Sequence, residues 1–204
     1  MNLSLQALLC GEADRLRYIR RFSTCYVVHE ESVAEHSFYV SLYSFMIAEW
    51  AILQGQTLDL ASVLSRAIVH DLEEARTGDI FRPLKVNHPD VKKALAAAAQ
   101  FEVGEVLRGP FGNDSEAVVR WTALWTEAKE PNTPEGAVVA FADFLSVLGY
   151  VLSEIKVSNV TMRIHRDTLL PYAESFLTEP AYEFLRPLAR DAHDLLWEAL
   201  RETA

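Results

Sequence analysis

Four side chains that can bind a metal ion stand in apolar surroundings along this sequence. His36 enters the most apolar segment of the chain, and Asp143 interrupts an almost wholly apolar run at 136–145. His70 and Asp71 stand together at the end of another apolar helical pattern. A buried polar group is costly unless a hydrogen bond or an ion satisfies it, and a buried aspartate needs a cation or a basic partner. We therefore interpret these four residues as candidates for one buried site.

A set of two imidazoles and two carboxylates has a defined preference among metal ions. Mixed nitrogen and oxygen donors suit Mn²⁺, Fe²⁺, Co²⁺ or Zn²⁺ better than the all-oxygen shells of Ca²⁺ and Mg²⁺. Neighbouring residues on a helix point about 100° apart, so His70 and Asp71 need other helices to complete a shell. The residues alone leave a second interpretation open, in which buried His–Asp hydrogen bonds or an Asp143–Arg pair take the place of a metal.

Other residues with reactive side chains are interpreted as structural. Four further histidines stand beside charged or turn-forming residues and are predicted to be solvated. They are His29, His88, His165 and His193. The two cysteines, Cys10 and Cys25, are too few for a disulfide framework and are predicted to be small buried residues in a reducing compartment. Four aromatic residues are predicted to belong to the core. They are Trp121, Trp125, Phe141 and Phe144.

The elements that must position these residues are predicted to be helices. No run alternates apolar and polar residues for long enough to indicate a strand, whereas helical periodicity is common between sparse turn signals. Helices are predicted at about 3–19, 33–53, 60–76, 89–107, 115–126, 134–155, 160–177 and 181–201. Thr133 is expected to cap the helix that Pro134 begins, and Pro171 and Pro187 are expected to break or kink the last two. The sequence therefore predicts an all-α single domain over residues 1–204.

Composition excludes several classes of protein. Of the 204 residues, 50% are hydrophobic and 24% are charged, which is typical of a globular chain that buries about 70% of its unfolded surface. The 19 Lys and Arg against 29 Asp and Glu give a net charge of −10, which repels long nucleic acid. No signal-peptide pattern opens the chain, and the longest uncharged stretch, 37–48, is shorter than the roughly 18 residues of a membrane span. We expect a cytoplasmic protein without a membrane partner.

Together with their flanking residues, the candidate ligands resemble a known family. The matching segments, in chain order, are RRF at 20–22, ESVAEHS at 31–37, HDLEE at 70–74, TGDI at 77–80, PLK at 83–85 and AD at 142–143. This array resembles the HD-domain metal-dependent phosphohydrolases, and in detail the small bacterial 5′-deoxynucleotidases and the phage-encoded dATP triphosphohydrolases. It covers about residues 17–150, two-thirds of the chain. A His-Asp pair alone is a weak signal, whereas these segments in this order are specific.

The resemblance implies an HD-domain helical bundle that holds one divalent ion through His36, His70, Asp71 and Asp143. It implies that Glu74 orients or deprotonates the attacking water, or protonates the leaving oxygen. By spacing alone, Glu74 would be interpreted as an exposed residue.

The resemblance also implies residues that bind the substrate. Asp79 matches a carboxylate of the substrate pocket that lies close to a sugar hydroxyl, whereas its turn-like surroundings alone indicate a cap residue. Arg21 matches an arginine that grips phosphate, and Lys85 is a second cation that can meet it. Phe22 stands where the bacterial deoxynucleotidases carry a tryptophan that packs against the sugar and disfavours a 2′-hydroxyl. Phenylalanine keeps an apolar plate there but is smaller and has no indole N–H.

Three hypotheses about function follow. The first is a 5′-deoxynucleotidase, which converts a deoxynucleoside monophosphate to a deoxynucleoside and phosphate, because the spacing from Asp71 to Asp143 is close to that of the monophosphate enzymes. The alternative is a deoxynucleoside triphosphate triphosphohydrolase, which further cations at Arg82 and Lys85 would favour. The third is a non-catalytic helical binding module with a structural metal, which the presence of Glu74 disfavours. The resemblance also favours a homodimer or higher homo-oligomer, with residues 160–201 completing the core or forming the dimer face.

Overall fold

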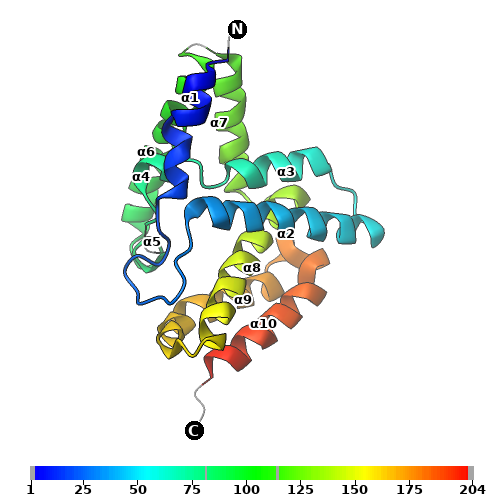
Figure 1. Ribbon diagram of the computed structural model, residues 1–204. Coiled ribbons are helices and arrows are strands. Elements are labelled where there is room, and N and C mark those ends of the chain that lie inside the picture. The colour runs from blue at the N-terminus through cyan, green and yellow to red at the C-terminus, as the bar shows by residue number, and fades with distance from the viewer. Residues whose placement is uncertain (1–2, 81, 114, 202–204) are drawn as a thin grey trace.

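Helix α2, Val33–Leu53, crosses the middle of the molecule, with the other helices packed above and below it (Figure 1). The computed structural model describes residues 3–80, 82–113 and 115–201, and within these ranges it contains helices and no strand. The predicted all-α fold is confirmed. The elements that precede α4 are α1 Leu5–Cys10, η1 Glu12–Arg17, α2 and α3 Leu60–Val69. The elements that follow are α4 Glu74–Thr77, α5 Arg82–Asn87, α6 Pro89–Phe111, α7 Glu116–Ala128, α8 Pro134–Lys156, η2 Val160–His165, α9 Arg166–Thr178, η3 Pro180–Leu185 and α10 Arg186–Leu200.

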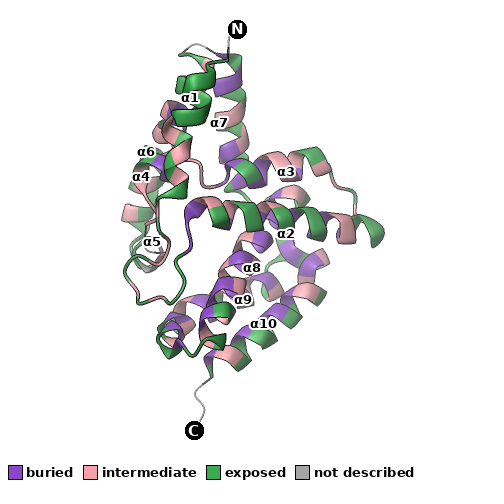
Figure 2. Cartoon of the chain, viewed as in Figure 1, coloured by how far each residue is buried: buried purple, intermediate pink, exposed green. Residues whose placement is uncertain are grey.

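The main core forms where α2 and α3 pack on α8, and where α9 and α10 cover the other side of α8 (Figures 1 and 2). Phe176 is fully buried there, and its ring centroid lies 5.1 Å from that of Phe141 and 5.2 Å from that of Phe144. A smaller cluster joins α3, α6 and α7 around Trp125. Trp121 is half-buried at the edge of this cluster, so three of the four aromatic residues predicted to be core are buried.

Two N-caps fix the helices that carry His36 and Asp143. Ser32 and Glu35 form a reciprocal capping box at the start of α2, in which the Ser32 N–H donates to Glu35 at 2.7 Å. This cap places His36 in the first turn of α2. Thr133 accepts a hydrogen bond from Gly136 N–H and Pro134 begins α8, as the sequence predicted.

Segment 19–21 is paired with the start of α2. The Arg21 N–H donates to the Glu31 carbonyl at 2.9 Å, and the Val33 N–H donates to the Ile19 carbonyl at 3.0 Å. The segment that carries Arg21 is therefore held beside the helix that carries His36.

The helix predicted over 60–76 is interrupted at the point that matters for the site. Helix α3 ends at Val69, residues 70–73 form a turn, and α4 begins at Glu74. In a continuous helix His70 and Asp71 would point about 100° apart. His70 keeps helical backbone angles at this turn, and the half-buried Asp71 brings Oδ2 to 3.1 Å from His70 Nε2.

The prolines and glycines in these helices act in different ways. The break predicted at Pro187 is present, since the helix expected over 181–201 divides into η3 and α10 at Arg186, and Pro187 lies in the first turn of α10, where a missing N–H is tolerated. Pro171 instead lies inside α9 and does not end it. Helix α6 continues through Pro110 to Phe111, although the sequence indicates a turn from Gly109 onward. The helix predicted over 3–19 divides at Gly11. Asp114, the last residue of the predicted turn, lies outside the described residues.

Helix α8 is, in the part of the chain that the structure describes, the one helix long and apolar enough to cross a membrane. Of its most apolar 18-residue window, 56% is buried against the rest of the protein. Packing inside the fold therefore accounts for its composition. The cysteines differ from their predicted burial, since Cys10 is exposed and Cys25 is half-buried, and both are free thiols.

Candidate functional site

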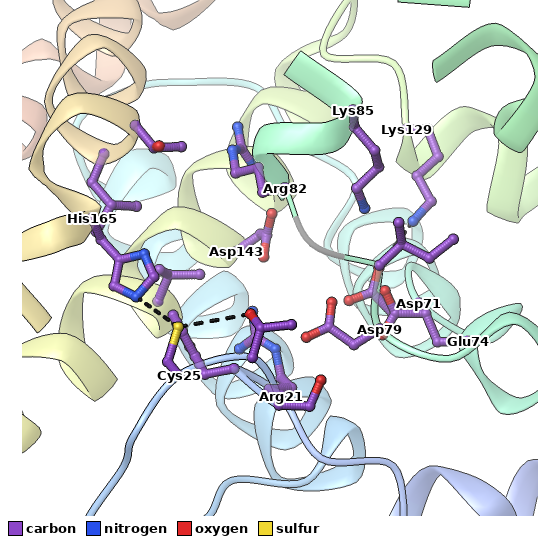
Figure 3. A pocket seen from close by; sticks show the side chains of 17 residues that line it. Arg21, Cys25, Asp71, Glu74, Asp79, Arg82, Lys85, Lys129, Asp143 and His165 are labelled. Atoms are coloured by element: carbon purple, nitrogen blue, oxygen red, sulfur yellow. Dashed lines mark hydrogen bonds and ion pairs between the residues drawn. The ribbon is translucent and has the colours of Figure 1, made fainter. Parts of the chain in front are cut away.

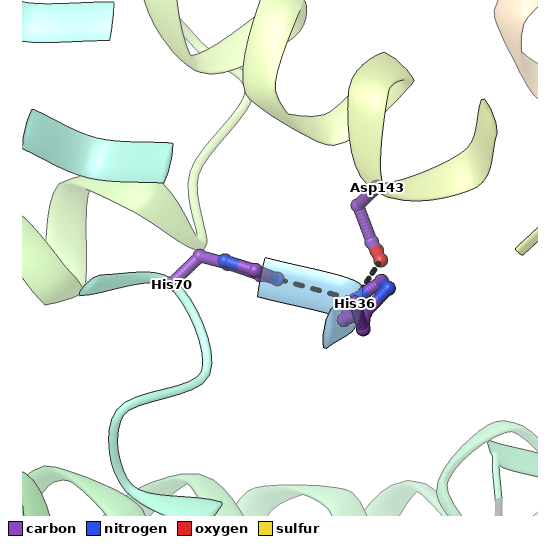
Figure 4. A group of neighbouring side chains, drawn as sticks. All are labelled: His36, His70 and Asp143. Carbon is purple, nitrogen blue, oxygen red and sulfur yellow. Dashed lines mark hydrogen bonds and ion pairs between the residues drawn. The ribbon is translucent and has the colours of Figure 1, made fainter. Parts of the chain in front are cut away.

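Three of the four predicted ligands, His36, His70 and Asp143, place donor atoms within 4.8 Å of one another (Figure 4), and the fourth, Asp71, lies beside the two histidines. His36 comes from the first turn of α2, His70 and Asp71 from the turn after α3, and Asp143 from the middle of α8. The two Nε2 atoms lie 3.3 Å apart. Asp71 Oδ2 lies 3.1 Å from His70 Nε2 and 3.4 Å from His36 Nε2, and Asp143 Oδ1 lies 3.2 Å from His36 Nε2.

The hydrogen bonds at the Nδ1 atoms of His36 and His70 indicate whether the Nε2 atoms can offer a lone pair to a metal ion. His70 Nδ1–H donates to the Ala67 carbonyl at 2.7 Å, so the Nε2 of a neutral His70 ring carries a lone pair. His36 Nδ1 lies 2.9 Å from Ser146 Oγ, one turn after Asp143 on α8. Lone pairs of two buried imidazoles and two half-buried carboxylates thus lie close together at the pocket wall. The chemistry of this donor set fits a divalent ion, with the outer hydrogen bonds that orient metal-binding histidines.

The electrostatics of the cluster favour positive charge. Burial acts to lower the pKa of His70, but the charges of Asp71 and Asp143 outweigh it and raise that pKa. Burial acts to raise the pKa of Asp71, but the charges of His70 and Lys129 hold it well below its ordinary value. The pKa of Asp143 is lowered as well, because its hydrogen bond to His36 outweighs burial. Both carboxylates stay ionised and attract a proton or a metal ion.

Lys129 is a site residue that the sequence analysis missed. Its Nζ donates to Asp71 Oδ1 at 2.9 Å and lies 3.0 Å from Glu73 Oε1, and Glu73 also accepts from the indole N–H of Trp125. One oxygen of Asp71 thus binds Lys129 while the other faces the histidines. Lys129 ends α7 four residues after Trp125, which puts both on one helix face, but no feature of the sequence links them to Asp71.

A pocket of about 290 Å³ opens beside the cluster (Figure 3). It brings together the predicted residues Arg21, Phe22, Glu74, Asp79 and Lys85 with Asp71 and Asp143. The remaining lining residues are Ser23, Thr24, Cys25, Ile80, Arg82, Lys129, Val147, His165, Thr168 and Leu169. His36 and His70 are not in the lining and are buried behind it. A small molecule or ion that enters the pocket therefore contacts Asp71 and Asp143 before the two histidines.

Glu74 is buried, although its place in the sequence alone indicates an exposed residue. Its Oε2 atom has no hydrogen-bond partner among the described residues. Burial raises the pKa of Glu74 to about 10, and the negative charges of Asp71, Asp79 and Glu73 act in the same direction. The Glu74 carboxyl can therefore hold a proton near neutral pH, at the wall of a pocket lined by ionised aspartates.

Four cations face the pocket, and they differ in how far they are already paired. Arg21 donates to Glu31 at 2.8 Å, and Lys129 binds two carboxylates. Arg82 stacks on the Tyr172 ring, 3.7 Å from its centroid, and its Nε has no hydrogen-bond partner in the described part of the chain. Lys85 makes no ion pair with any residue that the structure describes. Lys85 and Arg82 are thus the cations least committed to protein carboxylates.

The other end of the pocket is aromatic. Phe22 adopts a left-handed backbone with φ of 53°, which bulky residues rarely do. Its ring stacks on Tyr150 at 4.8 Å and meets the edge of His165 at 5.3 Å. His165 was predicted to be solvated and is instead buried, with Nε2 3.5 Å from Cys25 Sγ. The charged residues around it in the sequence gave no sign that helix packing would turn its ring inward.

The other three histidines lie at the surface. His29 and His88 are exposed, and His193 is half-buried beside Asp194.

Comparison with known proteins identifies relatives over most of the chain. The model of the HD domain family matches residues 13–180. The 5′-deoxynucleotidase of Shewanella oneidensis is 27% identical over 171 residues, which cover 82% of this chain and 84% of that protein. A protein of Pyrococcus horikoshii has a similar fold, with a TM-score of 0.74 at 22% identity over 94% of this chain and 99% of its own. The cyanophage S-2L HD phosphohydrolase DatZ, solved with dA and one catalytic Zn²⁺ ion, has a TM-score of 0.57 at 18% identity, covering 95% and 99%.

The hydrogen bond between Ser146 and His36 provides a test of the donor cluster. Ser146→Ala leaves all four donor side chains in place but frees the His36 ring to turn. We expect Mn²⁺ affinity, measured by calorimetry, to fall about tenfold to a hundredfold. Ser44→Ala is the matched control, because Ser44 is equally buried on α2 and its hydroxyl has no partner among the described residues. Equal Mn²⁺ affinity in both variants would contradict the role of Ser146.

Proposed function

The chain belongs to the HD domain family, and from this we propose that it is a metal-dependent 5′-deoxynucleotidase. It hydrolyses a 2′-deoxynucleoside 5′-monophosphate to a deoxynucleoside and phosphate. The observation that carries this proposal is one pocket lined by Asp71 and Asp143, with His36 and His70 buried behind them, by a buried carboxyl with an unpartnered oxygen, by cations and by an aromatic wall. The likeness to a 5′-deoxynucleotidase over 82% of the chain supports the choice of substrate.

His36, His70, Asp71 and Asp143 would hold one divalent transition ion. When bound, such an ion lowers the pKa of a water molecule and neutralises phosphate charge. The donor set is compatible with Mn²⁺, Co²⁺, Fe²⁺ and Zn²⁺, and the Zn²⁺ in the phage phosphohydrolase supports zinc as one candidate. Lys129 keeps one oxygen of Asp71 engaged, which leaves the other directed at the cluster.

Glu74 and Asp79 do the remaining chemistry in this proposal. The Glu74 carboxyl takes a proton from the attacking water or gives one to the leaving 5′-oxygen of the nucleoside. Both roles are part of the proposal, because a cation held by Asp71 would offset the negative charge that raises the pKa of Glu74. The Asp79 carboxylate accepts a hydrogen bond from a sugar hydroxyl and so aligns the nucleotide.

The phosphate and the sugar of the substrate contact different parts of the pocket, and these contacts orient the nucleotide. Arg21 and Lys85 bind the phosphate, since a guanidinium fork and an ammonium both suit phosphate oxygens. Phe22 packs against the sugar and disfavours a 2′-hydroxyl there. Its smaller ring makes the preference for deoxyribose weaker than a tryptophan would.

The alternative substrate, a deoxynucleoside triphosphate, is favoured by one observation. Arg82 and Lys85 both line the pocket, and both are free of protein carboxylates in the described structure. Arg21 and Lys129, however, already neutralise Glu31, Asp71 and Glu73. We nevertheless place the monophosphate first, because the relative that matches 82% of this chain is a 5′-deoxynucleotidase.

We further propose that the chain acts as a homo-oligomer, most simply a homodimer, in the cytoplasm. Helix α2 leaves Phe38, Phe45 and Met46 exposed on its surface, and these apolar side chains support self-association. Light scattering in solution is expected to give at least twice the 23.0 kDa of one chain. A mass of one chain at micromolar concentration would contradict this.

A substrate panel tests the proposed activity. The purified protein, loaded with Mn²⁺ or Co²⁺, is assayed on mono- and triphosphates of ribo- and deoxynucleosides. We expect phosphate release from deoxynucleoside monophosphates and little from their ribose counterparts. Release of inorganic triphosphate from deoxynucleoside triphosphates would establish the alternative. No turnover of any nucleotide by the metal-loaded protein would refute both.

Two variants separate metal binding from proton transfer. Asp71→Ala is expected to lose bound metal and with it activity, because a ligand is removed. Glu74→Ala is expected to keep the metal and to lose turnover by about a hundredfold to ten-thousandfold. Metal content and kcat are measured on the same preparations, with Asp191→Ala, an exposed site on α10, as the control. Loss of metal in Glu74→Ala would show that Glu74 serves the metal site instead.

A further inference from the structure

The segment 22–29 forms a wall of the pocket yet lies outside every helix. Phe22 and Cys25 line the pocket from this loop, and Phe22 is held with φ of 53°. A phenylalanine does not stay in the left-handed region unless its surroundings oblige it to. The shape of the pocket therefore depends on contacts that fix the loop from outside.

The strongest of these contacts go to Glu154, near the end of α8. This carboxylate is fully buried, and the Val28 N–H donates to its Oε2 at 2.7 Å. Its Oε1 accepts from the His29 N–H at 2.8 Å and lies 3.2 Å from His29 Nδ1. Asn159 Nδ2 donates to Oε2 at 2.7 Å. Glu154 has no Lys or Arg partner among the described residues. Its negative charge is therefore stabilised chiefly by the hydrogen bonds from these N–H groups.

Two residues near Glu154, Tyr150 and Asn159, also hold the loop, and Tyr150 contacts Phe22 directly. The Tyr150 hydroxyl donates to the His29 carbonyl at 2.6 Å, and the Tyr150 ring stacks on Phe22 with an interplanar angle of 19°. Asn159 Nδ2 also donates to the Tyr26 carbonyl at 3.1 Å. The end of α8 thus grips the loop at both its backbone and its aromatic side chain.

We propose that Glu154 is a positioning residue that holds loop 22–29 so that Phe22 stays at the pocket wall and discriminates against ribose. The inference rests on the proposed function, because only there does Phe22 meet a sugar. Glu154 does not line the pocket and touches no substrate. Its effect passes through Val28, His29 and the Tyr150–Phe22 stack.

Glu154→Gln tests this with almost no change in shape. Whichever oxygen becomes an amide nitrogen then faces a backbone N–H, so two donors oppose each other. We expect KM for a deoxynucleoside monophosphate to rise about tenfold, and the deoxy-to-ribo ratio of kcat/KM to fall by a similar factor. We expect kcat to change less than threefold or so and Mn²⁺ affinity to stay unchanged, because the metal ligands are untouched.

Glu135→Gln is the matched control on the same helix. Glu135 is half-buried at the other end of α8 and accepts one hydrogen bond, from the Asp59 N–H at 3.1 Å. The KM and the deoxy-to-ribo ratio of the Glu135→Gln variant should equal those of the wild type.

A second variant and a second readout keep the test decisive. Tyr150→Phe keeps the stacked ring and removes only the bond to the His29 carbonyl, so it should shift the sugar preference in the same direction by a smaller factor. It also decides the matter if Glu154→Gln does not fold. Amide hydrogen exchange at Val28 and His29 should be faster in Glu154→Gln whether or not any nucleotide is turned over.

The outcomes separate the two proposals. A wild type that hydrolyses no nucleotide, with faster exchange in Glu154→Gln, would defeat the deoxynucleotidase and leave Glu154 as the loop anchor. An active wild type whose folded Glu154→Gln variant keeps the same KM and sugar ratio would overturn the positioning role. A fall in kcat with loss of Mn²⁺ at constant KM would overturn it too, because the damage would then lie at the metal site.

Discussion

The structure depends on one cluster, in which two imidazoles and two carboxylates lie close together. The ionised carboxylates attract positive charge, and the helices and turns around them hold the four side chains in place. The capping box at Ser32 sets the first turn of α2 so that His36 faces inward. At the turn after Val69, Asp71 Oδ2 lies 3.1 Å from His70 Nε2 and 3.4 Å from His36 Nε2. The chain thus leaves the helix predicted over 60–76 at the residues that form the cluster, just as it divides the helix predicted over 3–19 at Gly11.

The sequence was most informative where a polar residue contradicts its surroundings. Asp143 in an apolar run and His36 at the entrance of another are conspicuous because burying them without a partner is costly. The helices that carry them were predictable for another reason, since both are long apolar segments bounded by turn or cap residues. Glu74 and Asp79 became candidates only through their resemblance to a family, because by spacing alone they resemble surface residues.

Other features depend on contacts that no local pattern records. Lys129 stands in a charged stretch at the end of α7, and only the packing of α7 beside the turn at 70–73 brings it to Asp71. His165 is surrounded by charges in the sequence, but η2 turns its ring toward Phe22 and Cys25. The net charge of −10 is equally uninformative about the site. Four cations line the pocket there, and Glu31, Asp71 and Glu73 are paired with two of them.

Four residues on successive turns of helix α8 make contacts of different kinds. Asp143 faces the donor cluster, Ser146 contacts His36, Tyr150 stacks on Phe22, and Glu154 accepts from the N–H groups of the loop. At 1.5 Å per residue the row spans about 16 Å, so one helix sets the distance between the donor cluster and the Phe22 wall of the pocket. One residue inserted or deleted within that row would swing everything beyond it by about 100°. A substitution along α8 would leave the other residues of the row in place, whereas a change in the number of residues between Asp143 and Glu154 would separate the loop from the donor cluster.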